Sequence, residues 1–169
     1  QLSSEFLADK EFSGAQGLQV TDAMAVAIAA QACLPVLHLG LSWYDDFKGI
    51  VVHPGAMLAR REVVDDLGVV HRYREEITGE AMAGGPVTLS WQDVASADGL
   101  AGDGYNVVIH EFAHKIDMRD GLADGCPRLA SRAAYAHWQT VMQSAYERFR
   151  AQVVMADRFG AEPPWLDAY

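Results

Sequence analysis

The residues best suited to chemistry lie in the segment His110-Glu111-Phe112-Ala113-His114, which has the spacing HExxH. Residues four apart on an α-helix share one face, so the two imidazoles can bind a single ion. Zinc accepts imidazole nitrogen at roughly 2.0–2.1 Å. Glu111 can take a proton from a zinc-activated water and pass it to the leaving amine. The spacing therefore predicts zinc-dependent peptide hydrolysis, with His110 and His114 as ligands and Glu111 as the general base.

The alternative is a chance HExxH on an ordinary helix that holds no metal. A chance motif is more often solvent-facing and surrounded by polar residues. In this chain the apolar run 107–109 precedes the motif, and the uncharged residues Phe112 and Ala113 lie inside it. This context favours a metal site on a helix that is buried deeply enough to exclude water.

Two histidines do not complete a catalytic zinc site, which normally has a third protein ligand. In HExxHxxGxxH enzymes that ligand would be Asp120, but the glycine that ends the helix in those enzymes is replaced by Asp117. Asp117 shares a helical face with His110. It is either a carboxylate that holds an imidazole by its free N–H or a helix-end residue bonded to local backbone. Asp120 and Gly121 are expected to form a turn.

Periodicity and capping signals predict the elements that position the motif. Helices are expected over 21–34, from Ser90 onward, over 105–118 and over 131–155. Strands, indicated by β-branched runs, are expected over 48–53, 68–73 and 86–91. No repeat or linker divides the chain. A single α+β domain over residues 1–169 is therefore predicted.

Two of these elements carry further expectations. Val87, Thr88 and Leu89 form either an edge strand that pairs with an extended peptide substrate or an ordinary core strand. The last helix has an apolar stripe that includes Trp138, and this stripe is expected to pack into the core. A polar, glycine-containing connection is expected over 74–85.

Composition and charge narrow the classes of protein to which the chain can belong. The 169 residues include 13 Lys and Arg against 23 Asp and Glu, a net charge of −10 without a basic stripe. Such a chain repels phosphate, so neither nucleic acid nor a membrane is an expected partner. The most apolar stretch, residues 23–41, is too interrupted to span a bilayer. Cys33 and Cys126 fit free thiols in a reducing compartment, so a cytoplasmic protein is predicted.

Segments well outside the motif are similar to one known family. The chain resembles the Mlc titration factor A family of zinc peptidases in segments spread over nearly its whole length: 106–118, 120–121, 124–125, 6–12, 28–33, 43–44, 52–55, 79–80 and 85–93. The resemblance implies a gluzincin, in which the two His of HExxH and a Glu from a later helix bind zinc. The expected fold is a single zincin-like α+β domain with a small, mostly antiparallel sheet, the HExxH helix and further packing helices.

The resemblance also implies a third zinc ligand. In that family a Glu follows a Leu-Asp-x-Tyr segment, which matches Leu166-Asp-Ala-Tyr169, so the ligand is expected beyond residue 169. The tyrosine of the segment is expected to stabilise the tetrahedral intermediate as a phenol donor, a role that falls on Tyr169. The chain is expected to be cut at both ends. Without the third ligand it is predicted to be inactive or weakly active.

The resemblance implies two functions. The first is aminopeptidase-like hydrolysis of peptide substrates in the cytoplasm. The second is a regulatory binding module that sequesters a transcription repressor, Mlc, with catalysis secondary. Both remain open at the level of the sequence.

Overall fold

The computed structural model describes residues 1–64, 70–100 and 106–164, and it describes the backbone alone for 60–64, 71–73 and 97–100. Its elements follow in chain order: α1 (Leu2–Asp9), β1 (Glu11–Gly14), α2 (Asp22–Ala32), the 3-10 helix η1 (Leu41–Tyr44), β2 (Gly49–His53), β3 (Met57–Val64), β4 (Val70–Ile77), β5 (Gly79–Ala81), β6 (Val87–Ser90), α3 (Trp91–Leu100), α4 (Val107–Asp117), the 3-10 helix η2 (Met118–Asp120) and α5 (Arg132–Phe159).

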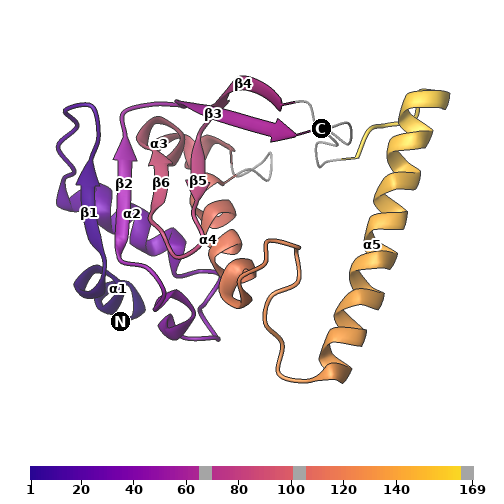
Figure 1. The fold of residues 1–169 in the computed structure, drawn as a ribbon, viewed down its shortest axis with the longest axis horizontal. Coiled ribbons are helices and arrows are strands. Elements are labelled where there is room, and N and C mark those ends of the chain that lie inside the picture. Colours follow the sequence, from indigo (N-terminus) through magenta and orange to yellow (C-terminus); the bar gives the residue numbers. More distant parts are fainter. Residues whose placement is uncertain (65–69, 101–105, 165–169) are drawn as a thin grey trace.

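Four strands form one sheet in the order β1-β2-β6-β5, with β1 and β5 at its edges (Figure 1). Strands β1, β2 and β6 are parallel, and β5 runs antiparallel to β6. The expectation of a mostly antiparallel sheet is therefore wrong for this sheet. In this sheet only β5 and β6 are joined by a short turn. The parallel strands β1, β2 and β6 are joined by long connections that return the chain to the end of the sheet where each strand begins. The mixed sheet and the helices confirm the α+β class.

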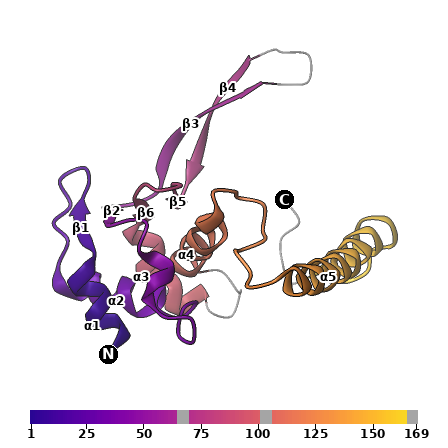
Figure 2. The same cartoon turned by 60° about the horizontal axis from the view of Figure 1, so that its bottom comes forward.

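Strands β3 and β4 form a separate antiparallel ribbon, which Figure 2 shows extending away from the sheet. The pairing runs from Met57 opposite Ile77 to Val64 opposite Val70. The strand expected over 68–73 falls largely in β4. Strand β3 was not predicted because its central residues are charged or small rather than β-branched.

Helices α2, α3 and α4 lie together on one face of the sheet (Figures 1 and 2). Between them and the sheet is an aromatic cluster in which Phe112 of α4 contacts Phe6, Tyr44 and Phe47. The ring centroids of Phe112 and Tyr44 are 5.0 Å apart with the planes at 73°, an edge-to-face arrangement that favours aromatic pairs. All four residues are buried. The cluster fixes α4, and with it the HExxH segment, against the body of the domain.

Helix α5 stands apart from the sheet and its covering helices (Figure 1). Its Ser131 N-cap accepts a hydrogen bond from the backbone of Ala134, and Gly160 ends the helix in the left-handed conformation at φ 65°. The expectation that the stripe containing Trp138 packs into the core is wrong. No residue of α5 is buried, and Val141 and Tyr146 on that stripe are 48% and 57% exposed. Periodicity reveals an apolar face but does not show what covers it.

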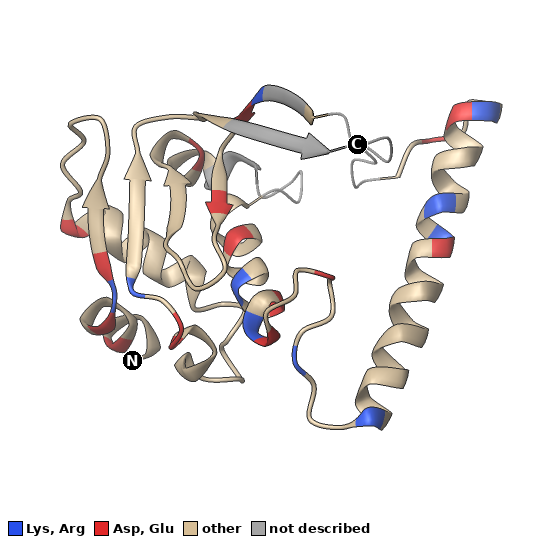
Figure 3. Ribbon diagram, viewed as in Figure 1, with Lys and Arg blue, Asp and Glu red and all other residues tan. Residues whose placement is uncertain are grey.

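Acidic and basic residues are interspersed along the described part of the chain, as the coloured ribbon in Figure 3 shows. The arginines of α5 alternate along the helix with acidic and uncharged positions. Within the described part of the chain, no helix has both the length and the apolarity that crossing a bilayer would require.

Candidate metal centre

The beginning of α4 is fixed by a side-chain cap. Asn106 Oδ1 accepts from the Ile109 N–H at 2.9 Å, which satisfies one of the free donors of the first turn. The other end of the same amide, Nδ2, donates to Gln31 Oε1 on α2 at 2.7 Å. Asn106 therefore sets both where the helix begins and how it sits against α2.

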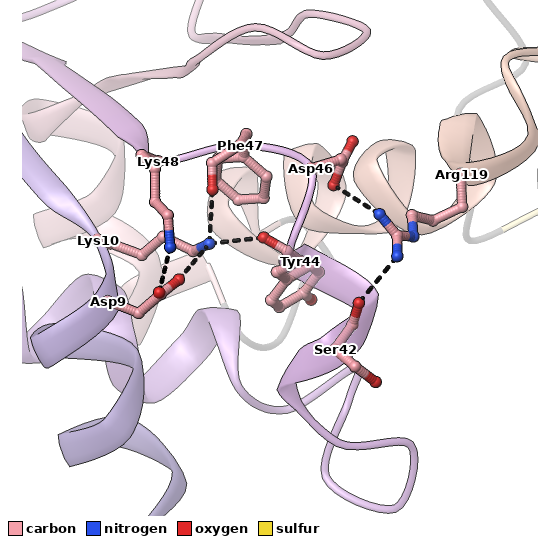
Figure 4. Close-up of polar contacts among 8 residues, drawn as sticks. All are labelled: Asp9, Lys10, Ser42, Tyr44, Asp46, Phe47, Lys48 and Arg119. Carbon is pink, nitrogen blue, oxygen red and sulfur yellow. Dashed lines mark hydrogen bonds and ion pairs between the residues drawn. The ribbon is translucent and has the colours of Figure 1, made fainter.

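The far end of α4 is held by the residues that follow it. The helix passes directly into η2, and Arg119 donates to the Ser42 carbonyl at 3.0 Å and pairs with Asp46 at 3.4 Å (Figure 4). Gly121 closes η2 at φ 93°, a conformation that favours glycine. Asp120 Oδ1 accepts from the Leu122 N–H at 3.2 Å, so the predicted turn at Asp120 and Gly121 is confirmed.

Helix α4 has one buried face and one exposed face that each carry ionisable side chains. Glu111 and Lys115 are one turn apart and buried, at 5% and 0% exposure. His110 and His114 are also one turn apart, but both are exposed. Strand β5 packs against the helix. The carboxyl group thus lies on the sheltered side of the helix, and the imidazoles lie where an ion can reach them.

The two imidazoles converge. Their Nε2 atoms are 3.1 Å apart, and the rings stand nearly perpendicular, at 85°, with centroids 4.7 Å apart. Two nitrogens bound to one tetrahedral zinc ion at roughly 2.0–2.1 Å lie roughly 3.3 Å from each other. The observed spacing is close to that value. His110 and His114 therefore fit two ligands of one metal ion.

The protonation of His110 also suits metal binding. Its ring is exposed, yet the surrounding protein removes part of its water and lowers its pKa, and neighbouring His114 lowers it further. Both causes favour the neutral imidazole. A neutral imidazole is the form that binds a metal ion.

Glu111 lies against the backbone of β5. A methyl group on Gly79 would be 2.6 Å from both Cγ and Oε1 of Glu111, so only glycine leaves room for this carboxyl group. Burial raises the pKa of Glu111 to about 7, the Ala81 N–H opposes the rise by donating to the carboxylate, and nearby Glu80 adds to it. A carboxyl group with a pKa near neutrality is suited to accepting and returning a proton.

Within the described part of the chain, Asp117 bonds to backbone and not to an imidazole. Its Oδ2 accepts from the Gly125 N–H at 3.0 Å, as the local-backbone alternative predicted. Its Oδ1 is buried, and no hydrogen-bond partner for it is found among the described residues. Across residues 1–64, 70–100 and 106–164, no group of three or more His, Cys, Asp or Glu side chains could hold a metal ion. Neither Asp117 nor Asp120 therefore completes the histidine pair.

An open cleft of about 440 Å³ lies beside the histidine pair. It is bounded by the exposed face of α4, the loop after η2 and the first turns of α5, and it is lined by His110, Ala113, His114, Ile116, Asp117, Ala123, Gly125, Pro127 and Trp138. Trp138 Nε1 donates to the Gly125 carbonyl at 3.2 Å, which links the loop to α5. The cleft offers room for part of a peptide next to the two imidazoles.

The segment expected as a substrate-binding edge is an interior strand. Val87, Thr88 and Leu89 pair with β2 on one side and with β5 on the other, so both backbone edges of β6 are occupied. The core-strand alternative is correct, and the edge beside α4 is β5. Sequence reasoning missed β5 because three residues are too short to show periodicity. Tyr169 lies outside the described residues.

Comparisons with known proteins show similarity to one family along the whole chain. The profile of the family described as Glucose-regulated metallo-peptidase M90 matches residues 1–169. Similar curated proteins include Mlc titration factor A of Cronobacter sakazakii (strain ATCC BAA-894), 36% identical over 100% of this chain and 62% of that protein. The proteins of the same name in Klebsiella pneumoniae (strain 342) and Yersinia pestis (strain Pestoides F) are each 35% identical, over 100% and 99% of this chain and 62% and 60% of their own lengths. The chain thus spans about three fifths of these relatives.

Proposed function

Because the chain belongs to the glucose-regulated metallo-peptidase M90 family, we propose that it is the motif-bearing part of a zinc-dependent, aminopeptidase-like peptidase. The observation that carries the proposal is one arrangement on α4. Two exposed imidazoles converge to 3.1 Å on one face, and a buried carboxyl group with a pKa of about 7 lies on the neighbouring face. A metal ion and a base are the two parts that metal-assisted hydrolysis of an amide by water uses.

Each residue has a defined task in this proposal. His110 and His114 hold the metal ion. When bound, zinc supplies a Lewis acid that lowers the pKa of water and polarises the scissile carbonyl. Glu111 takes a proton from the attacking water and passes it to the nitrogen of the leaving amine. Since its pKa is near 7, the carboxyl group is balanced between the two forms that these transfers need.

Other parts of the proposal are supported by the family relationship. The third ligand is proposed to be a Glu beyond residue 169, as the family resemblance implies. Tyr169 is proposed to donate to the developing oxyanion. Asp117, whose Oδ1 has no partner in the described part of the chain, is proposed to orient a neighbouring imidazole. A zincin-like single domain and a cytoplasmic location complete the proposal.

The metal part is tested by zinc affinity, measured by competition with a chromophoric chelator. The wild-type chain, His114→Ala and a control, His137→Ala, are compared, because His137 is exposed on α5 and away from the cleft lining. We expect His114→Ala alone to weaken zinc binding. Equal zinc affinities in all three proteins would refute His114 as a ligand.

The catalytic part is tested with Glu111→Gln at saturating zinc, in a protein of the relatives' length. Release of an amino-terminal residue from short peptides is the readout. We expect the variant to bind zinc like the wild type but to lose hydrolysis, because an amide cannot take the proton. Undiminished hydrolysis by Glu111→Gln would remove Glu111 from the mechanism.

A second candidate function is favoured by the names of the relatives, which describe titration of Mlc. In this alternative the chain sequesters a transcription repressor of the Mlc type, and catalysis is secondary. Glu111→Gln separates the two functions, since it leaves the surface unchanged while removing the base. Retained repressor binding with lost hydrolysis would show that the functions are independent, and loss of both would show that they are coupled.

A further inference from the structure

Lys115 is a fully buried residue that the mechanism above does not use. It follows Glu111 by one helical turn, so both side chains project toward the β5–β6 hairpin. The Lys115 ammonium donates to the carbonyl oxygens of Met82 and Gly85 at 2.7 and 2.8 Å. These two residues lie in the turn that joins β5 to β6. The ammonium therefore links that turn to α4.

The turn has few other attachments. The Gly85 N–H donates to the Met82 carbonyl at 3.0 Å, and the Met82 N–H donates to the Pro86 carbonyl at 3.2 Å. Gly84 has a φ of +62°, a conformation that favours glycine. Strand β5 itself is only three residues long and lies at the edge of the sheet. A strand so short gains little stability from its own pairing, so its position depends on packing against α4.

Burial of the Lys115 ammonium is unfavourable in itself. Burial lowers the pKa of Lys115, the Asp46 carboxylate partly opposes that shift, and Asp46 itself forms an ion pair with Arg119. The two carbonyls and the face of Phe47, whose centroid is 4.3 Å from Nζ, replace the lost water. An apolar side chain of similar length would avoid this cost. We therefore expect the ammonium to act by positioning the groups to which it donates.

The hairpin that Lys115 holds forms the surroundings of Glu111. Gly79 leaves the space that the carboxyl group fills, and the Ala81 N–H donates to it. We propose that Lys115 is a positioning residue for peptide hydrolysis, which holds the β5–β6 hairpin against α4 so that β5 encloses the Glu111 carboxyl group. This inference rests on the proposed role of Glu111 as the base.

Lys10 provides a matched control. Its ammonium is also buried, lies 4.2 Å from the centroid of the same Phe47 ring, and donates to the carbonyls of Tyr44 and Phe47 at 2.6 and 2.7 Å (Figure 4). It differs from Lys115 in having an ion pair with Asp9, and both carbonyls to which it donates belong to residues 44–47 rather than to the hairpin. Lys10→Met and Lys115→Met thus remove similar groups from one cluster, but only the second releases the turn.

The experiment compares both variants in the 169-residue chain by amide hydrogen exchange, with the Ala81 amide as reporter and the Val52 amide of β2 as internal reference. We expect Lys115→Met to raise Ala81 exchange, relative to Val52, by about tenfold or more, whereas Lys10→Met changes the ratio by less than about twofold. The same pair is compared for kcat and KM in a protein of the relatives' length. There Lys115→Met should lower kcat by about tenfold and leave KM within about twofold, because the base and not the cleft is displaced.

Equal effects of the two variants on the Ala81 ratio would overturn the proposal, since they would show a general loss of packing. An unchanged kcat in Lys115→Met beside an active wild type would also overturn it. If the wild-type protein hydrolyses no peptide, the proposed function fails. The Ala81 ratio then still decides whether Lys115 holds the hairpin.

Discussion

The raised pKa of Glu111 predicts that the ionised Glu111 carboxylate reduces the stability of the domain. Burial moves the pKa from 4.5 to about 7 in the folded chain. A raised folded-state pKa means that ionisation is harder in the folded state than in the unfolded state. The destabilisation is therefore absent below about pH 4.5, grows as the pH rises, and is complete above about pH 7. Glu111→Gln, which cannot ionise, should remove it.

The size of this effect follows from the same values. At roughly 1.4 kcal/mol for each pKa unit, the difference between 4.5 and about 7 corresponds to about 3.5 kcal/mol. The side chain is 5% exposed, so solvent screening reduces this figure only modestly, and we expect about 2–3 kcal/mol. Gln retains an oxygen that can accept from the Ala81 N–H. The substitution therefore removes the charge with little change in shape.

The assay is urea unfolding of the metal-free chain, followed by tryptophan fluorescence at pH 5, 6, 7 and 8 with a chelator present. The stability of Glu111→Gln relative to wild type should rise from small at pH 5 to about 2–3 kcal/mol at pH 8. Glu11→Gln, at an exposed position on β1, serves as the control for loss of a carboxylate. A stability difference that does not depend on pH would refute the reasoning, as would a wild type more stable than the variant at pH 8.

Three further predictions test the site and its supports. Gly79→Ala places a methyl group 2.6 Å from Glu111 Cγ and should lower kcat by about tenfold in steady-state assays, with zinc affinity unchanged. Zinc at 100 times its dissociation constant should stabilise the chain by about 2.7 kcal/mol in thermal unfolding, and chelation should reverse the gain; His114→Ala should show neither change. Asn106→Ala removes the cap from the Ile109 N–H and should cost about 1–2 kcal/mol in chemical denaturation, and a loss below about 0.3 kcal/mol would contradict the capping role.

Local signals in the sequence predicted helices α2, α3, α4 and α5 but not the short helix α1. The helix over 105–118 corresponds to α4, and the signals at Thr21 and Ser90 mark real caps, since both side-chain oxygens accept backbone N–H groups three residues later. Capping and periodicity depend on neighbours along the chain, so a single sequence contains them. The HExxH spacing likewise placed His110 and His114 on one helical face.

The surroundings of the Glu111 carboxyl group could not be predicted in the same way. Gly79 and Ala81 are more than 29 residues from Glu111 in the chain, and their strand is too short for a periodic pattern. The order of the strands in the sheet could not be predicted from the sequence either. The sequence around Val87 is equally compatible with an edge strand and an interior strand, and only its pairing with β2 and β5 decides between them. These features depend on pairing between distant segments, which local propensity does not specify.

The parallel pairing of β1, β2 and β6 has a consequence for how the domain folds. Each of these pairings joins segments separated by more than 30 residues, so the chain must close long loops before any of their hydrogen bonds form. Helix α4 needs only local contacts to begin forming, and the β5–β6 turn is also local. That hairpin can join the rest of the sheet only after β2 is in place, because β6 pairs with β2. The two histidines can therefore share a helical face early in folding, while Glu111 acquires its sheltered position only when the slow, non-local part of the sheet is complete.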